Sequence, residues 1–369
     1  MKNIKVCHIS TVHPRFDVRI FHKECKSLSN IFDSIYLVVA DGLGDEEVDN
    51  IIILDTCKPS GRKDRFLHAE KKALTKALST NADVFHLHDP ELLRITSRLL
   101  KHKKIVIYDS HEDLPRQILN KPYIPRALRG IISNIVESFE NRKAQRLNGI
   151  VAATPHIRDR FKKINRSTID INNYPKIGDI KFHETWSMRE KYIAYIGGIF
   201  KTRGIFETLD AINGTDIKLL LAGKFSPLEL EKECRAHPGW ENVDYLGFLD
   251  RQGINNVLSK ARLGMVILEA TPSYLVSLPV KMFEYMASGL QVIASDFPLW
   301  NQIISDSKCG ICVDQTNPNE IKSKIEGIID DISVLSKMGQ NGRLSIENTY
   351  NWEIEETKLF DFYKSLINN

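Results

Sequence analysis

One carboxylate, Glu284, stands in an otherwise apolar predicted helix in the second half of the chain. The helix and the strand predicted after it lie in the segment L-P-V-K-M-F-E-Y-M-A-S-G-L-Q-V-I-A-S-D-F-P, from Leu278 to Pro298. Glu284 follows Phe283 on or near the predicted buried face, where an ionised carboxylate is costly unless it is paired or offered hydroxyl donors. A ribose diol would supply two such donors. The alternative is a solvated Glu284 that pairs with Lys281 one turn earlier, worth only about 0.2 to 0.5 kcal/mol.

A second segment has the composition of a phosphate site. It reads Y-I-A-Y-I-G-G-I-F-K-T-R-G, a predicted strand that enters a turn at Gly197 and Gly198 and then carries Lys201 and Arg203. Glycines let a backbone approach a ligand closely, a helix N-terminus presents free N–H groups, and an arginine can bind phosphate oxygens bidentately. A tight turn with two solvated cations is the equally weighted alternative.

Two histidine-rich segments in the first half follow predicted strands. They read H-L-H-D-P-E from His86 and Y-D-S-H-E-D from Tyr108. A histidine such as His111 can donate to sugar hydroxyls or carry a proton, or it can simply cap a loop. The pattern H-x-H-D could suggest a metal site, but no third ligand stands at a characteristic spacing, so no metal is expected.

A polar loop follows the first predicted strand, with His13, Arg15, Asp17 and Arg19 within S-T-V-H-P-R-F-D-V-R. These side chains could meet an acceptor substrate or could be charges that pin the loop. The loop has no G-x-G-x-x-G pattern, which argues against an ordinary dinucleotide dehydrogenase. The chain also has no Walker phosphate loop and no nucleophile elbow.

The elements that must position these residues alternate between short apolar runs and amphipathic stretches. We therefore expect two α/β domains in the 369 residues, each with a mostly parallel sheet, and a cleft at the carboxyl ends of their strands. In the carboxylate segment, Pro279 suits the first helical position and Gly289 a left-handed helix stop. The predicted domains are 1–175 and 176–350, with a linker at 174–190 and a C-terminal helix, 351–369, that crosses back to the first domain. The predicted strands are 5–9, 35–39, 51–54, 84–87, 105–108, 150–153, 192–196, 218–222, 243–246, 263–268, 291–294 and 311–313, and the predicted helices of the first half are 69–78, 91–101 and 127–146.

Charge is unevenly distributed along the chain. Residues 1–175 carry 30 Lys+Arg against 21 Asp+Glu, a balance of +9, which leaves 21 against 26, or −5, for the remainder. A basic half suits anionic substrates, an anionic membrane surface or nucleic acid, and the last is not expected because no nucleic-acid-binding motif stands out. Six scattered cysteines suggest no disulfide framework, and the absence of a secretory or membrane-spanning segment predicts a cytoplasmic protein.

Taken together, the motifs resemble glycosyltransferase family 4, whose GT-B architecture is α/β with two Rossmann-like domains facing across a cleft. The resemblance covers nearly the whole chain and points to a subgroup common in bacterial surface-polysaccharide synthesis, such as O-antigen, capsule or exopolysaccharide. It rests on S-T-V-H-P-R-F-D-V-R-I-F-H-K-E-C-K-S-L, H-D-P-E-L-L, Y-D-S-H-E-D, Y-I-G-G-x4-R-G and P-V-K-M-F-E-Y-M-A-S-G.

The resemblance implies retaining transfer of a hexosyl or N-acetylhexosaminyl group from a UDP- or GDP-sugar to a glycan or lipid-linked acceptor, without a metal or other cofactor. Glu284 would hold the ribose, Arg203 and Lys281 the diphosphate, and His111 the donor sugar. Leu249 falls where the family's backbone contacts the base, and Gly197 and Gly198 would also bind the donor nucleotide. The loop with His13, Arg15 and Asp17 would lie on the acceptor side.

Two positions depart from the family pattern. Val276 replaces a glutamate that usually contacts the donor sugar, and Gly198 replaces an arginine that usually contacts the diphosphate. The competing functions are therefore a GT-B sugar-nucleotide 2-epimerase, which would turn over the donor alone, and a catalytically silent nucleotide-sugar-binding scaffold.

The basic first half also contains a candidate membrane surface between Asn120 and Arg146. A peripheral site on the inner membrane would place the enzyme near a lipid-linked acceptor, whereas an ordinary amphipathic core helix would explain the same apolar residues. The cations are Lys121, Arg126, Arg129, Arg142, Lys143 and Arg146, and the apolar residues are Ile124, Leu128, Ile131, Ile132 and Ile135.

Overall fold

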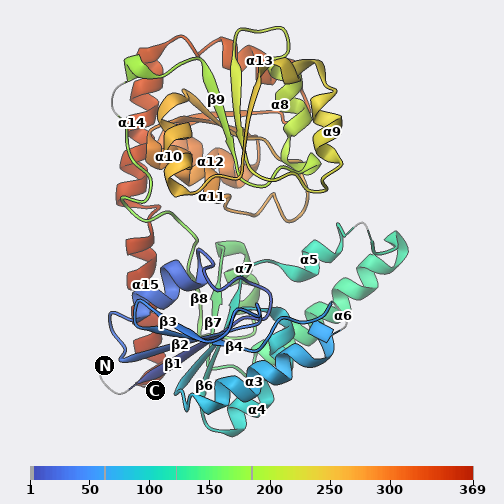
Figure 1. Cartoon of the computed structure of the whole chain (residues 1–369), viewed down its shortest axis with the longest axis vertical. Helices are drawn as coiled ribbons and strands as arrows, with labels where there is room; N and C mark the ends of the chain where they lie inside the picture. Colours follow the sequence, from blue (N-terminus) through green and yellow to red (C-terminus); the bar gives the residue numbers. More distant parts are fainter. Residues whose placement is uncertain (1–3, 62–63, 122, 184–185, 369) are drawn as a thin grey trace. The chain divides into compact units, whose positions relative to one another are not determined.

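The structure is a computed structural model that describes residues 4–61, 64–121, 123–183 and 186–368. The chain folds into two compact units (Figure 1). The first contains the described residues up to Asn173 together with those from Glu355 onward, and the second contains Tyr174–Ile354. Each unit has its own sheet and its own core, as expected for two Rossmann-like α/β domains.

The first unit is built on an eight-stranded sheet of order β3-β4-β2-β1-β5-β6-β7-β8. All neighbouring strands are parallel except the edge pair of β3 and β4. The strands are β1 Lys5–Ile9, β2 Ser34–Val39, β3 Glu46–Val48, β4 Ile51–Asp55, β5 Val84–Leu87, β6 Ile105–Ser110, β7 Gly149–Ala152 and β8 Thr168–Asp170. The helical segments are η1 Ile20–Cys25, α1 Lys26–Leu28, η2 Arg65–Ala69, α3 Glu70–Ser79, η3 Pro90–Arg94, α4 Thr96–Lys101, α5 Leu114–Ile118, α6 Arg126–Ala144 and α7 Pro155–Lys162.

The second unit has a six-stranded, fully parallel sheet of order β11-β10-β9-β12-β13-β14. Alternate residues of β9 fall into two separate core clusters, Ala194 and Ile196 in one and Ile193 and Tyr195 in the other, so both faces of this sheet are covered. The strands are β9 Tyr192–Ile196, β10 Lys218–Ala222, β11 Val243–Gly247, β12 Leu263–Val266, β13 Gln291–Ser295 and β14 Gly310–Val313. The helical segments are η4 Trp186–Met188, η5 Lys201–Arg203, α8 Ile205–Ile212, α9 Leu230–Arg235, η6 Pro238–Asn242, α10 Arg251–Lys260, α11 Val280–Ser288, α12 Pro298–Ser307, α13 Pro318–Glu326 and α14 Ile332–Asn348.

All twelve predicted strands are present, and none of their ends differs from the prediction by more than two residues. Two further strands, β3 and β8, were not predicted because each has only three residues. The helix predicted at 91–101 is instead a 3-10 turn, η3, followed by the short helix α4, and Thr96 Oγ1 donates to the Leu93 carbonyl where they join. Pro279 is the N-cap of α11 rather than its first residue, while Gly289 ends that helix with a left-handed φ of 77°, as predicted.

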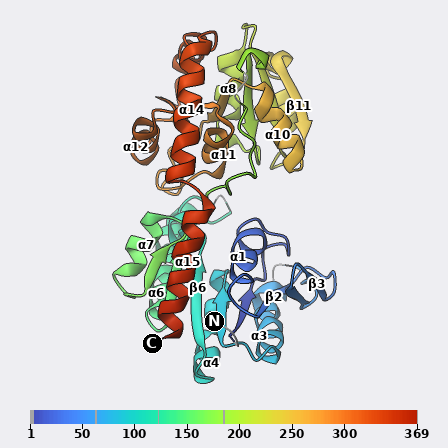
Figure 2. The ribbon, with the colours of Figure 1, turned by 90° about the vertical axis from the view of Figure 1, so that its left-hand side faces the viewer.

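The final helix, α15, spans Trp352–Ile367. Its first residues, up to Ile354, belong to the second unit, and the rest belong to the first. From Glu355 onward its residues pack with the first unit, where it lies alongside the helices and strands of that domain (Figure 2). Its Tyr363 is fully buried, and the hydroxyl lies 2.7 Å from His86 Nδ1. The last helix of the chain therefore completes the core of the first unit.

The segment predicted as a linker, 174–190, is packed within the second unit and is anchored by Arg189. The buried Arg189 guanidinium donates to the carbonyls of Leu258 (2.8 Å), Ala261 (2.6 Å), Ser288 (3.0 Å) and His183 (3.2 Å). Three of these carbonyls lie at the C-terminal ends of α10 and α11, where a helix leaves its last carbonyls unpaired and favours a cation. Arg189 thus holds together the two helices that carry much of the site described next.

Candidate functional site

Two positions of the turn after β9 require glycine, because their backbone angles disfavour any residue with a side chain. Gly197 has a φ of 103° and Gly204 a φ of 66°, both in the left-handed region that favours glycine. A side chain at Gly204 would also meet the Ile267 carbonyl oxygen at 2.5 Å, so this glycine lets the start of α8 approach β12. The space within 4 Å of a Cβ at Gly197 is open, which leaves the turn accessible to a ligand.

The position of Arg203 depends on the missing side chain at Gly198. Arg203 Nη1 donates to the Gly198 carbonyl at 3.3 Å, and its guanidinium lies 4.9 Å from the centroid of the Phe200 ring. A Cβ at position 198 would come within 2.7 Å of that ring and 3.4 Å of Nη1. The absence of a side chain at Gly198 therefore makes room for the Phe200 and Arg203 side chains.

Lys281 brings a second cation to this turn. Its Nζ atom lies 4.1 Å from the centroid of the Tyr195 ring, is buried, and has no hydrogen-bond partner among the described residues. Burial, together with the charge of Arg203, lowers the pKa of Lys281 to about 7. A buried amine without an acceptor, next to a guanidinium, is an arrangement that an anion would stabilise.

Glu284 lies one turn further along α11, and it does not make the pair with Lys281 that the alternative interpretation proposed. Its Oε1 accepts from Arg251 Nη1 at 2.6 Å, and Lys281 points instead to Tyr195. The Glu284 side chain is 13% exposed, so it lies near the buried face as expected but remains reachable.

Leu249, half-buried against the core, comes two residues before Arg251. No pattern in the sequence pointed to Arg251, because it stands 33 residues from Glu284.

In the first unit, His111 is fixed by a buried carboxylate. His111 Nε2 lies 2.8 Å from Asp109 Oδ2, and the same carboxylate accepts two hydrogen bonds from Arg19 at 2.8 and 2.9 Å. Burial opposes ionisation, but Arg19 and His111 hold the pKa of Asp109 well below its ordinary value. His111 itself is partly exposed at the carboxyl end of β6. A histidine oriented by an ionised carboxylate can bind a hydroxyl in a fixed direction.

The predicted acceptor loop divides into two parts. Arg15 is buried and binds Asp41 and Glu46, which favours the interpretation that it pins the loop. Asp17 accepts from the backbone N–H groups of Arg19 and Ile20 and so fixes the start of η1. The ring of His13 lies next to that of His111, with the two ring centroids 4.8 Å apart. Although burial opposes it, the hydrogen bond that Asp17 accepts from His13 raises the pKa of His13.

Two groups of metal-ligand side chains gather among the described residues of this unit. One consists of His88, Asp109 and His111, and the other of His8, Glu24, His86 and His88. The sequence indicated only the pair in H-x-H-D, because His8 and Glu24 come from other elements with no recognisable spacing. Burial lowers the pKa of His88 to about 4 and that of His8 and His86 well below 6.5, so these rings are neutral.

The second half of the chain is similar to a known family. Residues 176–345 match the family model described as glycosyl transferases group 1. A D-rhamnosyltransferase, WbpZ, from Pseudomonas aeruginosa is 24% identical over 283 residues, which is 72% of this chain and 69% of that protein. The matches span only 42% to 69% of the lengths of the curated relatives.

Solved structures of similar fold match the chain over nearly its whole length. A sucrose-phosphate synthase from Thermosynechococcus elongatus superimposes with a TM-score of 0.78 at 14% identity, over 99% of both chains. HepE from Anabaena, in complex with UDP and glucose, gives a TM-score of 0.74 at 12% identity, over 98% of this chain and 100% of that one. The fold is therefore the GT-B fold, with two parallel-sheet Rossmann-like domains.

Proposed function

We propose that this chain is a retaining glycosyltransferase that transfers a sugar from a UDP- or GDP-sugar to a glycan or lipid-linked acceptor in bacterial surface-polysaccharide synthesis. The match of residues 176–345 to group 1 glycosyl transferases supports the reaction class. The observation that carries the site is the unpartnered ammonium of Lys281 beside Arg203 at an open glycine turn. These two cations suit a diphosphate, which is the part of the donor that they would bind and also the leaving group of the reaction.

In this proposal, the bond between the anomeric carbon and the diphosphate breaks while the acceptor oxygen bonds to the same face of the sugar. Arg203 and Lys281 stabilise the charge that develops on the leaving diphosphate, which is the electrostatic contribution expected to matter most. A phosphate oxygen takes the acceptor proton, so no protein nucleophile and no metal is required. Glu284 binds the ribose, with Arg251 orienting its carboxylate, Leu249 lies near the base, and His111 donates to a hydroxyl of the sugar.

The proposed reaction is tested with a panel of UDP- and GDP-sugars, each incubated with and without lipid-linked and glycan acceptors. We expect release of nucleoside diphosphate that depends on an acceptor, with the anomeric configuration kept in the product. An epimerised donor without acceptor would identify the epimerase instead. Donor-dependent thermal stabilisation without any transfer would identify a silent scaffold. The named relatives and the matched family are transferases, and no finding favours the epimerase.

Binding of the diphosphate should take up a proton through Lys281. With a pKa of about 7, the amine is largely neutral at about pH 8, and a bound diphosphate raises this pKa towards its ordinary value. The affinity for UDP or GDP is therefore expected to fall as the pH rises from about 7 to about 9. Calorimetry at about pH 8 in two buffers of different ionisation enthalpy measures the uptake. A Lys281→Arg variant, which stays charged, should bind without it, and equal uptake by both proteins would contradict the assignment.

A membrane surface on α6 belongs to the same proposal. Four apolar side chains form an exposed stripe, which the alternative of an ordinary core helix does not explain: Leu128 (47% exposed), Ile131 (58%), Ile135 (62%) and Phe139 (39%). They recur every three or four residues on a helix at the edge of the first unit (Figure 1), next to Arg126 and Arg142. Among the described residues, no helix is long and apolar enough to cross a bilayer. We therefore propose peripheral binding to the inner face of the cytoplasmic membrane.

Flotation with vesicles that contain phosphatidylglycerol tests this surface. Binding should weaken with added salt, and a variant with Ile131→Glu and Ile135→Glu should bind about tenfold or more weakly, because two anchoring side chains become charged. Leu344→Glu, at a 54% exposed position of α14, is the matched control and should float like the unchanged protein. Flotation that neither salt nor the double substitution reduces would contradict the proposal.

A further inference from the structure

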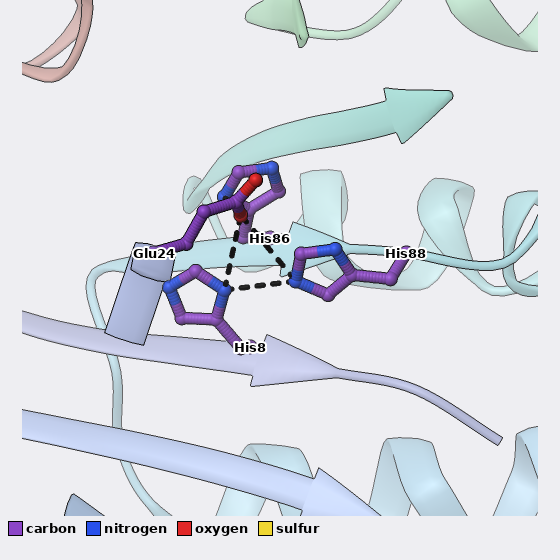
Figure 3. A group of neighbouring side chains, drawn as sticks. All are labelled: His8, Glu24, His86 and His88. Atoms are coloured by element: carbon purple, nitrogen blue, oxygen red, sulfur yellow. Dashed lines mark hydrogen bonds and ion pairs between the residues drawn. The ribbon is translucent and has the colours of Figure 1, made fainter. Parts of the chain in front are cut away.

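The core of the first unit contains a group of four polar side chains that the proposed transfer does not use. His8, Glu24, His86 and His88 are all fully buried, and Figure 3 shows the three imidazoles gathered around the carboxylate. Hydrophobic side chains usually occupy such positions, because a buried polar group costs free energy unless it finds a partner.

The sheet itself brings the three histidines to one face. β1 and β5 are parallel neighbours, and their register places His8 opposite His86. His88 follows His86 by two residues and so returns to the same side of the sheet. The ring centroids are 4.7 to 5.1 Å apart. The π-helical segment η1 covers this face and directs Glu24 towards the rings.

The carboxylate is close to the rings but bonds to none of them. Glu24 Oε2 lies 4.0 Å from His8 Nδ1, His86 Nδ1 and His88 Nε2, and it has no hydrogen-bond partner among the described residues. The other oxygen, Oε1, lies 3.1 Å from Arg19 Nε. One oxygen of Glu24 thus lies beside the Arg19 guanidinium, which also donates to Asp109, while the other stands at the same distance from three nitrogen atoms.

We propose that these four side chains bind one transition-metal cation of the Zn²⁺ type within the core of the first unit. Bonds of about 2.1 Å in a tetrahedral site place ligand atoms about 3.4 Å apart. Three of the separations here are 4.0 Å and one, between His8 Nδ1 and His88 Nε2, is a 2.8 Å hydrogen bond, so a bound cation would draw Glu24 inward, move those two rings apart and replace the contact of His86 Nδ1 with the Tyr363 hydroxyl. Three imidazoles and one carboxylate suit zinc and its neighbours, whereas Ca²⁺ and Mg²⁺ prefer more oxygen ligands.

The surroundings of the group support this choice of ligand. His88 would bind the cation through Nε2, and its other ring nitrogen lies 3.3 Å from Asp109 Oδ2, the carboxylate–histidine–metal arrangement that fixes a ligand's orientation. Four protein ligands leave no open position, which is typical of a structural rather than a catalytic site. The cation would join β1, η1 and β5 and would anchor the Asp109 carboxylate that orients His111. It would take no part in the transfer step, so this inference goes beyond the proposed function.

Metal content of the full chain tests the inference without any activity measurement. The purified protein is incubated with Zn²⁺ or Co²⁺, freed of loosely held ions by gel filtration with a chelator, and then denatured to release what it holds. We expect about one ion per chain and, for Co²⁺, the intense visible absorption of a four-coordinate site. Retention below about a tenth of an ion per chain, or a Co²⁺ spectrum typical of six-coordinate water and oxygen ligands, would overturn the proposal.

Variants then locate the ion. Glu24→Gln and His8→Gln should each lower ion retention by about tenfold or more, since each removes a ligand. His111→Gln is the matched control, because His111 belongs only to the neighbouring group with Asp109, and retention should be unchanged. Loss of the ion in His111→Gln to the same extent as in Glu24→Gln, or full retention in Glu24→Gln, would overturn the assignment. Circular dichroism checks that each variant is folded, and the Co²⁺ spectrum of the unchanged protein decides the question if a variant is not.

Discussion

Replacing Arg203 with alanine is expected to lower kcat/KM for sugar transfer by about 10²- to 10³-fold, the usual cost of removing a group that stabilises charge in a transition state. Arg203 lies at the glycine turn with its guanidinium against the Phe200 ring, and Lys281 adds a buried charge beside it. Lys281→Met should have an effect of the same order. Because the two cations would act on one diphosphate, the double variant should lose less than the product of the two single losses.

The matched control is Lys201→Ala. Lys201 lies two residues before Arg203 in the same turn, but it is exposed and its Nζ stands 5.6 Å from the centroid of the Phe206 ring. Its replacement should leave kcat/KM within a few-fold of the original value. Thermal unfolding of all variants separates a loss of transfer from a loss of folding. If Arg203→Ala and Lys281→Met both transferred sugar at the original rate, the diphosphate site would lie elsewhere.

Replacing Arg189 with leucine is expected to destabilise the second unit by about 3 kcal/mol or more, a large effect for one side chain. The substitution would leave buried carbonyls at the ends of α10 and α11 without their donor, and the guanidinium would no longer stack 4.6 Å from the centroid of the Trp186 ring. Urea unfolding followed by circular dichroism gives the change in the free energy of unfolding. Since the two units can unfold separately, the transition of the second unit is the one to compare.

Arg235→Leu provides the comparison within the same unit. Arg235 is 52% exposed and pairs with Glu231 one turn earlier on α9, so its loss should cost no more than about 0.5 kcal/mol. Equal destabilisation by the two substitutions would show that the buried hydrogen bonds of Arg189 contribute little. In that case the helix ends would have to be stabilised by other groups.

Local sequence patterns were sufficient to predict most strands and helices of the fold and part of the site. Apolar runs and their spacing located all twelve predicted strands and the final helix, because burial on a parallel sheet demands such runs. Gly289 was found as a helix stop, and Glu284 was placed near a buried face, since both depend only on the periodicity of α11. The very short strands β3 and β8 and the break between η3 and α4 were missed, because too few residues carry a pattern there.

The tertiary structure decided which partners these residues have. Glu284 binds Arg251 rather than Lys281, and Lys281 turns to Tyr195, because distant elements and not the next helical turn supply the contacts. The predicted linker became a packed segment for the same reason, since three of the four carbonyls that accept from Arg189 lie at the ends of α10 and α11. The exposure of Ile131 and Ile135 likewise depends on which side of α6 the rest of the first unit covers.

The sequence by itself therefore determined the fold class, the order of the strands along the chain and the residue types at their carboxyl ends. Only the tertiary structure showed that His8 and Glu24 join the pair in H-x-H-D, because strand register and the packing of η1 bring them together across the sheet. The physical reason is that helix and strand periods act over a few residues. The choice of a buried polar partner depends instead on which elements share a core, and spacing along the chain does not carry that information.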